Sequence, residues 1–227
     1  DIYHVQLNPT PMAVNPAYAG AYDWHFRASV FYGQLWTSVL SSPDEGYGIS
    51  FDMPVATFKN GSYLATGALA SRDNMERGRM KNASGVVSLA FHQHFMVAER
   101  PSDIAIGLQA GYTQRVFDLS SQYFGQSAAS IYSVVMSHYL GLGNTVNYYP
   151  FNTGMSFSQL LSQKFAYVIG FAAYNINQSA NPKEVFDNKR VGLERSSVVS
   201  AGFNWALIPR VEVRSAFSLQ TGSYQGL

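Results

Sequence analysis

Few residues of this chain have the types and spacing that chemistry requires. His92 and His94 lie two positions apart, so a strand would present both imidazoles on one face, at a spacing that suits metal ligands. No third ligand can be named, and the pair is interpreted as polar lining, with a metal site as the alternative. Gly141-Leu142-Gly143 is followed by Asn144, not by a completed dinucleotide fingerprint, and is therefore interpreted as a loop.

Other catalytic classes find little support in the composition. The chain has no cysteine, which excludes a thiol nucleophile, a disulfide framework and a thiolate metal site. The serines are numerous, but none lies in a nucleophile elbow. With a net charge of +1 and no basic clusters, nothing indicates a nucleic-acid partner. The sequence therefore predicts no cofactor and no enzymatic activity, with a membrane-embedded lipid-modifying enzyme kept as an alternative.

The elements around these residues are predicted to be long β-strands. Charged residues make up only 13% of the chain, and aromatic residues 15%. No apolar run approaches the roughly 18 residues of a membrane-spanning helix. Strict alternation of apolar and polar residues recurs instead, most clearly over residues 104–115, in stretches of about ten to fourteen residues that suit a tilted strand crossing a bilayer. The fold class predicted is all-β: a transmembrane, antiparallel, up-and-down β-barrel.

About nine strands are expected, near residues 24–36, 47–55, 62–71, 84–97, 104–115, 151–162, 165–177, 195–206 and 210–221. The connections alternate between long (37–46, 72–83, 117–150, 178–194) and short (56–60, 98–102, 163–164, 207–209), as in outer-membrane barrels. Residues 131–140 are interpreted as a structured loop or plug piece. Bacterial barrels use even strand numbers, so nine strands leave three alternatives: strands are missing from this chain, a partner covers the open edge, or the strand count is wrong.

The two faces of these strands are expected to meet different surroundings. Aromatic residues on the outer face are predicted to form the girdles: Trp24, Trp36, Tyr47 and Tyr112. Twelve residues separate the two tryptophans, which places them roughly 28 Å apart along the membrane normal. The inner face is rich in Gly, Ser and Ala, and its charged residues are Arg27, Asp52, Arg115, Glu212 and Arg214. Small inner residues suit either a water-filled pore or a plugged lumen.

Residues 1–23 differ from the rest and are expected to form an irregular periplasmic or lumen segment ahead of the barrel, residues 24–227. Asp1 resembles a mature N-terminus left by signal cleavage, although a trimmed chain would look the same. Within the segment, Asn15 suits a helix N-cap, Pro16 the first helical position, and Gly20 a left-handed stop. A single helical turn is therefore predicted, which could plug the lumen, dock a partner or simply anchor the barrel.

Several motifs resemble the PorP/SprF family of the type IX secretion system, an outer-membrane family of Bacteroidetes. In chain order, the motifs are His4-x-Gln6, Asn15-Pro16-Ala17-Tyr18-Ala19-Gly20, Tyr32-Gly33-Gln34-Leu35-Trp36, Ser50-Phe51-Asp52-Met53-Pro54, and Gly107-Leu108-Gln109-Ala110-Gly111-Tyr112 with Arg115 and Phe117-Asp118. Gly33 and Leu35 stand where the family commonly has arginine and glutamine. The resemblance covers most of the chain. Because members of the family continue for several more strands, it implies a complete barrel of about 12–14 strands whose C-terminal part is absent from this chain.

The resemblance implies a non-enzymatic, multi-pass outer-membrane component of the secretion machinery, and in gliding relatives a role in motility. The partners it implies are outer-membrane lipid, periplasmic ring proteins, a peptidoglycan-associated lipoprotein, and secreted or surface adhesin cargo. The position of the N-terminal segment ahead of the first strand predicts that its residues contact a partner or act as a plug: His4, Gln6, Asn15, Pro16, Ala17, Tyr18 and Gly20. The alternatives are a porin-like channel, the lipid-modifying enzyme and, more distantly, a soluble lipocalin-like binder.

Overall fold

The structure is a computed structural model, and it describes most of the chain. The described residues are 10–22, 25–35, 44–75, 80–117, 145–162, 164–178, 180–186, 189–192, 195–208 and 211–221. Residues 131–140 and Gly141–Gly143, for which loop structure was predicted, lie outside these ranges. Among the described residues, no helix is long and apolar enough to cross a membrane.

Two short helices precede the strands: α2 (Pro11–Val14) and the 3-10 helix η1 (Pro16–Tyr18). The strands are β1 (Arg27–Leu35), β2 (Asp44–Thr57), β3 (Tyr63–Met75), β4 (Met80–Val97), β5 (Arg100–Phe117), β6 (Thr145–Tyr148), β7 (Phe151–Ser162), β8 (Phe165–Tyr174), β9 (Ala180–Phe186), β10 (Lys189–Gly192), β11 (Ser196–Ile208) and β12 (Val211–Thr221).

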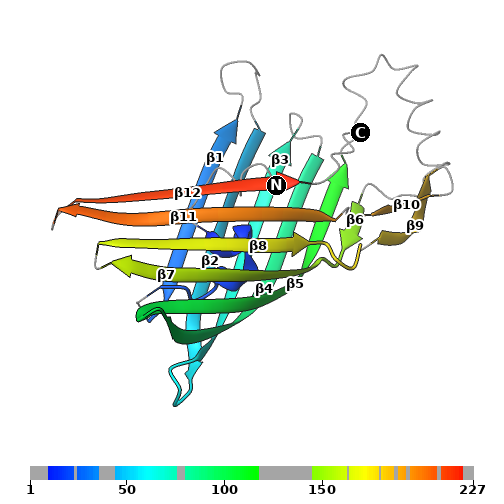
Figure 1. Cartoon of the computed structure of the whole chain (residues 1–227). Helices are drawn as coiled ribbons and strands as arrows, with labels where there is room; N and C mark the ends of the chain where they lie inside the picture. Colours follow the sequence, from blue (N-terminus) through cyan, green and yellow to red (C-terminus); the bar gives the residue numbers. More distant parts are fainter. Residues whose placement is uncertain are drawn as a thin grey trace, which may run out of the picture.

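One antiparallel sheet contains nearly all of these strands and confirms the all-β, up-and-down prediction. Its continuous path runs β1-β2-β3-β4-β5-β7-β8-β11-β12, with β6 paired to β5 at the side, and β9 and β10 form a separate hairpin. The strands on the path correspond one to one with the nine predicted from the alternation. Figure 1 shows the sheet curled into a half-barrel, with β7, β8, β11 and β12 crossing the upright β1–β5 and the two helices between them.

The predicted long connections are partly wrong, because the strands extend beyond the stretches where alternation is clear. β3 continues to Met75 and β4 begins at Met80, so most of the predicted loop 72–83 is a hairpin. Likewise β2 begins at Asp44, and β6, β9 and β10 lie within predicted loops. In the extensions of β2, β3 and β4, polar residues occupy both faces, so these stretches carry no period-two signal even though the backbone ladder continues. The predicted short connections do lie between paired strands, as at Ala98-Glu99.

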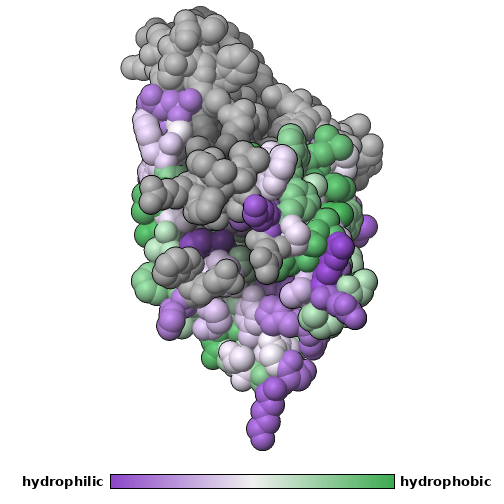
Figure 2. Space-filling view, turned by 60° about the vertical axis from the view of Figure 1, so that its left-hand side comes forward, coloured by the Kyte–Doolittle hydropathy of each residue, from purple (hydrophilic) through white to green (hydrophobic). Residues whose placement is uncertain are grey.

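Alternation along the strands separates an apolar outer face from a polar, small-residue inner face. In β5, Ile104, Ile106 and Leu108 are exposed, whereas Ala105, Gly107 and Gln109 between them are buried. Figure 2 shows hydrophobic residues gathered on the flanks of the molecule and hydrophilic residues at its lower end. Arg27, Asp52 and Arg115 lie on the inner face as predicted; the side chains of Glu212 and Arg214 are outside the described part. A sheet with these two faces matches a membrane barrel, whose outer face contacts lipid.

Aromatic residues lie near both ends of the outer face. Tyr47 and Tyr112 are 41% and 40% exposed, and the Tyr112 ring lies 5.6 Å from the Tyr149 ring. Towards the other end, the Phe157 ring lies 6.3 Å from that of Phe95 and 6.2 Å from that of Tyr167. Phe95 is level with Ser102 in β5, ten residues from Tyr112. At ~3.3 Å per residue and ~45° tilt, the two groups are roughly 23 Å apart along the normal, close to the ~25 Å apolar band of such barrels.

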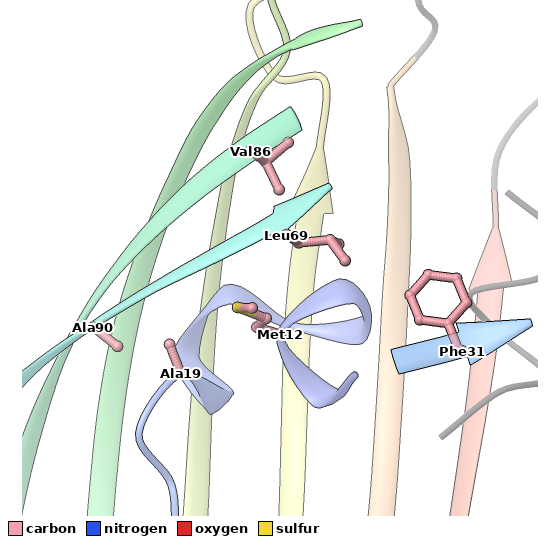
Figure 3. Packing of buried hydrophobic residues seen from close by; sticks show 6 residues of the cluster. All are labelled: Met12, Ala19, Phe31, Leu69, Val86 and Ala90. Atoms are coloured by element: carbon pink, nitrogen blue, oxygen red, sulfur yellow. The ribbon is translucent and has the colours of Figure 1, made fainter. Parts of the chain in front are cut away.

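A small apolar cluster lies inside the half-barrel. It joins Met12 and Ala19, from the segment ahead of β1, to wall residues Phe31, Leu69, Val86 and Ala90. Figure 3 shows these side chains converging from β1, β3 and β4 on the two helices. The interior of the sheet is therefore occupied by the chain's own N-terminal residues, and these position the site described next.

Candidate functional site

Residues 10–22, here called the N-terminal segment, cross the concave face of the sheet as two short helical turns. The Asn15 Oδ1 accepts a hydrogen bond from the Ala17 backbone N–H at 2.9 Å, as an N-cap does, and Pro16 opens η1. Gly20 ends the turn with φ +72°. The predicted cap, first helical residue and left-handed stop are thus all present. The preceding turn, α2, was not predicted.

Asn15 anchors the segment to the middle of β7 and β8. Its side-chain Nδ2 donates to the carbonyl oxygens of Met155 at 2.9 Å and Phe171 at 3.2 Å. These two residues are direct partners in the β7–β8 register. Asn15 is completely buried, and its amide is satisfied on both sides, by the wall through Nδ2 and by η1 through Oδ1. A buried amide costs free energy unless it is bonded in this way.

Glycines in the wall make room for this contact. Gly107 and Gly154 are register partners in β5 and β7, and Gly170 lies on the adjacent β8. A Cβ at Gly107 would lie 2.3 Å from the Ala17 nitrogen, and one at Gly154 would lie 2.0 Å from the Asn15 Oδ1. A Cβ at Gly170 would lie 2.4 Å from the Tyr18 hydroxyl oxygen. No side chain fits at these positions while the segment is in place.

Wall side chains bind the backbone carbonyls of the segment one after another. The hydrogen bonds are Gln109 Nε2 to Met12 O at 3.3 Å, Tyr174 hydroxyl to Ala13 O at 2.8 Å, Arg27 Nη2 to Tyr18 O at 3.1 Å, His92 Nε2 to Ala19 O at 2.9 Å, and Tyr63 hydroxyl to Gly20 O at 3.1 Å. The donors come from strands on both halves of the sheet. The wall therefore binds the segment mostly through the main-chain carbonyls of the segment, which would otherwise be buried without hydrogen-bond partners.

A buried ion pair holds the end of the segment. The Gly20 backbone N–H donates to the Asp52 Oδ2 at 2.7 Å, and Arg27 donates to both Asp52 oxygens, at 2.7 and 3.0 Å. The Asp52 side chain is 1% exposed and that of Arg27 25%. Tyr22 donates from its hydroxyl to the Asp52 carbonyl, and the Arg27 guanidinium lies 4.6 Å from the centre of its ring. Asp52 thus has several donors, as a buried carboxylate requires.

His92 binds the carbonyl oxygen of Ala19, the residue before Gly20. Its ring is fully buried and stacks on Tyr63, with centroids 4.4 Å apart and planes 2° apart. Its Nδ1 lies 3.1 Å from the Asp103 Oδ2, and the His94 Nδ1 lies 3.1 Å from the Asp103 Oδ1. The two histidines therefore share a carboxylate. Within the described residues no group of three or more His, Cys, Asp or Glu is arranged to hold a metal ion.

Tyr18 fastens the segment to β11. Its hydroxyl lies 2.8 Å from the Ser200 Oγ, across a sequence separation of 182 residues. Burial raises the pKa of the Tyr18 phenol, and the Ser200 hydrogen bond opposes that shift only in part. The neutral phenol is therefore the form that the wall accommodates.

The structure brings Asn15, Pro16, Ala17, Tyr18 and Gly20 together on the concave face. His4, Gln6, Trp24 and Trp36 lie outside the described residues. Tyr47 and Tyr112 are on the outer face, away from this site, and their girdle role stays a prediction.

Sequence reasoning did not connect the segment to its wall partners: Asp52, His92, Gln109, Gly107, Gly154 and Gly170. The alternation does place these residues on the inner face. That they all contact the same segment depends on the register between strands, which cannot be deduced from the sequence.

An antiparallel sheet with an apolar outer face, aromatic groups near both ends and a polar concave face filled by an N-terminal segment defines a β-barrel protein of membranes. The chain belongs to the PorP/SprF family: the model of this family, described as "Type IX secretion system membrane protein PorP/SprF", matches residues 1–225. The chain is thus a membrane component of the type IX secretion system, and the resemblance in its motifs is confirmed. Comparisons with curated proteins and with solved structures found no match.

Proposed function

We propose that this chain is a multi-pass outer-membrane protein that acts as a non-enzymatic scaffold in type IX secretion. It would anchor periplasmic ring proteins and a peptidoglycan-associated lipoprotein on one side, and surface-displayed adhesin cargo, including that of gliding cells, on the other. The observation that carries the proposal is the family match together with a concave face that is filled by the chain's own N-terminal segment. A scaffold needs surfaces and anchors rather than an open passage.

The outer membrane is the location that the strands favour. Residues such as Val30, Ile49, Ile106 and Phe217 project from the sheet, each more than half exposed. Contact with lipid allows such apolar residues to project from the sheet without cost, as on the outer face of a membrane barrel. Heat-modifiable migration of outer-membrane fractions on gels is expected. Solubility in plain buffer with no heat-dependent shift would count against the membrane location.

The filled concave face favours a scaffold over a porin-like channel. The N-terminal segment contacts strands from β1 to β11. The cavity beside it, lined by residues such as Ser71, Arg115 and Asn152, has a volume of about 150 Å³. We expect the protein to remain silent in planar bilayers. Steady ion conductance by the intact chain would favour the channel instead.

Crosslinking followed by affinity capture tests the scaffold directly. The tagged protein is captured from cells that carry the secretion system, and another outer-membrane barrel of the same cells serves as the control. Recovery of periplasmic ring proteins or a lipoprotein with this chain but not with the control is expected. Recovery of neither would contradict the scaffold role.

Deletion of residues 1–20 separates two roles of the N-terminal segment. If the segment only anchors the barrel, the deletion should abolish assembly in the membrane. If it serves docking, assembly should persist while secretion fails. Heat-modifiable migration reports the first outcome, and the amount of cargo on the cell surface reports the second.

A further inference from the structure

The N-terminal segment lies against the sheet as a ligand lies in its site. It adds no strand: its backbone contributes short helices, and the β-ladders from β1 to β12 pair with one another without it. Ala21, near the end of the segment, and His25, shortly before β1, are exposed. Removing the segment would therefore break no backbone pair of the sheet.

The wall beneath the segment is built mostly of polar and very small residues. Asp52, His92 and Gln109 face it directly, and Gln109 is bonded in turn to Ser88 at 2.9 Å and to Asn152 at 2.7 Å. Water can satisfy such groups when the segment leaves, whereas an apolar core would resist exposure. The apolar contribution comes from the cluster around Met12 and Ala19 (Figure 3) and from the buried Pro16 and Ala17. This composition suits reversible binding.

The contacts also select for sequence. Only an asparagine can accept from Ala17 while donating to the Met155 and Phe171 carbonyls across the space left by Gly154. At the other end, the φ of +72° at Gly20 disfavours any other residue, and a Cβ there would lie 2.3 Å from that of Ala65. The wall thus selects an asparagine at one end of the turn and a glycine at the other, and it binds the carbonyl oxygens of Tyr18, Ala19 and Gly20.

We propose that the concave face is a peptide-binding site, specific for a turn of the form Asn-Pro-Ala-Tyr-Ala-Gly, and that the N-terminal segment is its exchangeable ligand. A second polypeptide that carries the same turn can then replace the segment in the same site. The inference rests on these contacts alone and does not depend on the role in secretion.

The test uses the whole chain with a protease recognition sequence inserted between Tyr22 and His25. The protein is folded and purified in detergent, the linker is cleaved, and a fluorescent synthetic peptide of residues 10–22 is added. Fluorescence anisotropy measures exchange of the labelled peptide for the cleaved segment. Unlabelled peptides then compete: the native sequence, Asn15→Ala, Gly20→Ala, and Ala21→Ser as a control, because Ala21 is exposed.

Saturable uptake of the labelled peptide is expected, with the native and Ala21→Ser peptides competing equally. The Asn15→Ala and Gly20→Ala peptides should compete at least tenfold less well. A chain with Gly154→Ala should take up the peptide at least tenfold more weakly than the unmodified cleaved chain. Either of two results overturns the proposal: no exchange after complete cleavage, which would make the segment a permanent core, or equal competition by the Asn15→Ala peptide, which would remove the specificity.

Discussion

Replacing Gly154 by alanine should expel the N-terminal segment while leaving the sheet intact. The added Cβ would lie 2.0 Å from the Asn15 Oδ1, 2.9 Å from its Cγ and 3.0 Å from the Pro16 Cδ. Neither group can move away easily, because both are buried and Asn15 is bonded to two strands. Gly85 on β4 provides the matched control, because a Cβ there meets no atom within 4 Å.

The expected magnitude follows from the bonds that the methyl group displaces. Asn15 makes two hydrogen bonds to the wall, each contributing about 1 kcal/mol net. Their loss weakens docking by about 2 kcal/mol, which is about 30-fold in the equilibrium between docked and undocked segment. The sheet itself should gain, because alanine is favoured over glycine within a strand by roughly 0.5–1 kcal/mol. Gly154→Ala is therefore expected to weaken docking and to stabilise the strands at once.

Thiol labelling measures the docked fraction. The chain has no cysteine, so Met12→Cys introduces a single thiol at a position that is 1% exposed. The labelling rate with a maleimide then reports how often the segment undocks. Met12→Cys with Gly154→Ala should label about 30-fold faster than Met12→Cys with Gly85→Ala. Because both proteins carry the same cysteine, any effect of that change on docking cancels in the ratio.

A ratio within twofold would refute the reasoning. It would mean that the wall yields around the methyl group, or that the Asn15 contacts do not hold the segment. Heat-modifiable migration of both variants must remain normal for the comparison to stand. Fast labelling with a lost gel shift would instead mean that β7 needs the glycine for its own fold, and the Gly154 argument would fail.

Three further predictions follow from the same contacts. Asp52→Ala should lower the free energy of unfolding by about 3 kcal/mol, because it leaves the Arg27 guanidinium without its carboxylate. Denaturant titration should show no such loss for the control Lys59→Gln, at an exposed turn. Equal stability of the Asp52→Ala and unmodified proteins would contradict the buried pair. Tyr18→Phe and Ser200→Ala should each weaken docking by about 1 kcal/mol, because each removes the same hydrogen bond. The double variant should therefore weaken docking by hardly more than either single variant. Simple additivity would mean that the two hydroxyls are not coupled. Since burial raises the pKa of Tyr18, the docked form retains the phenol proton more firmly than the undocked form. The stabilisation of docking that depends on this proton should be fully present below the ordinary pKa of 10.0 and should be lost as the pH rises above it. Tyr18→Phe should lack that part of the pH dependence in the labelling assay.

Much of the sheet could be predicted from the sequence. A strand with one apolar and one polar surrounding has apolar and polar residues in alternation. Ile104, Ile106 and Leu108 predict β5 and its outer face, and the same rule places Arg27 and Asp52 inside. The rule fails where both surroundings are polar. For that reason the strand extensions after Arg72 and before Ala83 were interpreted as loop.

The local turn of the site could also be predicted, but its partners could not. Asn15, Pro16 and Gly20 begin and end the turn through their own backbone conformations and local hydrogen bonds, which depend on neighbouring residues in the sequence. The fit of Asn15 between Gly154 and Gly170 depends on strand register and on the curl of the sheet. The small inner residues are compatible with both a water-filled pore and a filled lumen. Only the assembled sheet shows that the segment lies against them.

The distances along the chain between the segment and its anchors bear on the order in which this protein folds. Asn15 bonds to residues 140 and 156 positions later, and Tyr18 to one 182 positions later. Contacts of such long range form late, because the loops they close must first be organised. The wall that receives Asn15 exists only after β7 and β8 have paired. The earliest described residues to leave the ribosome are thus expected to reach their places last, and docking of the segment would mark the completion of the sheet.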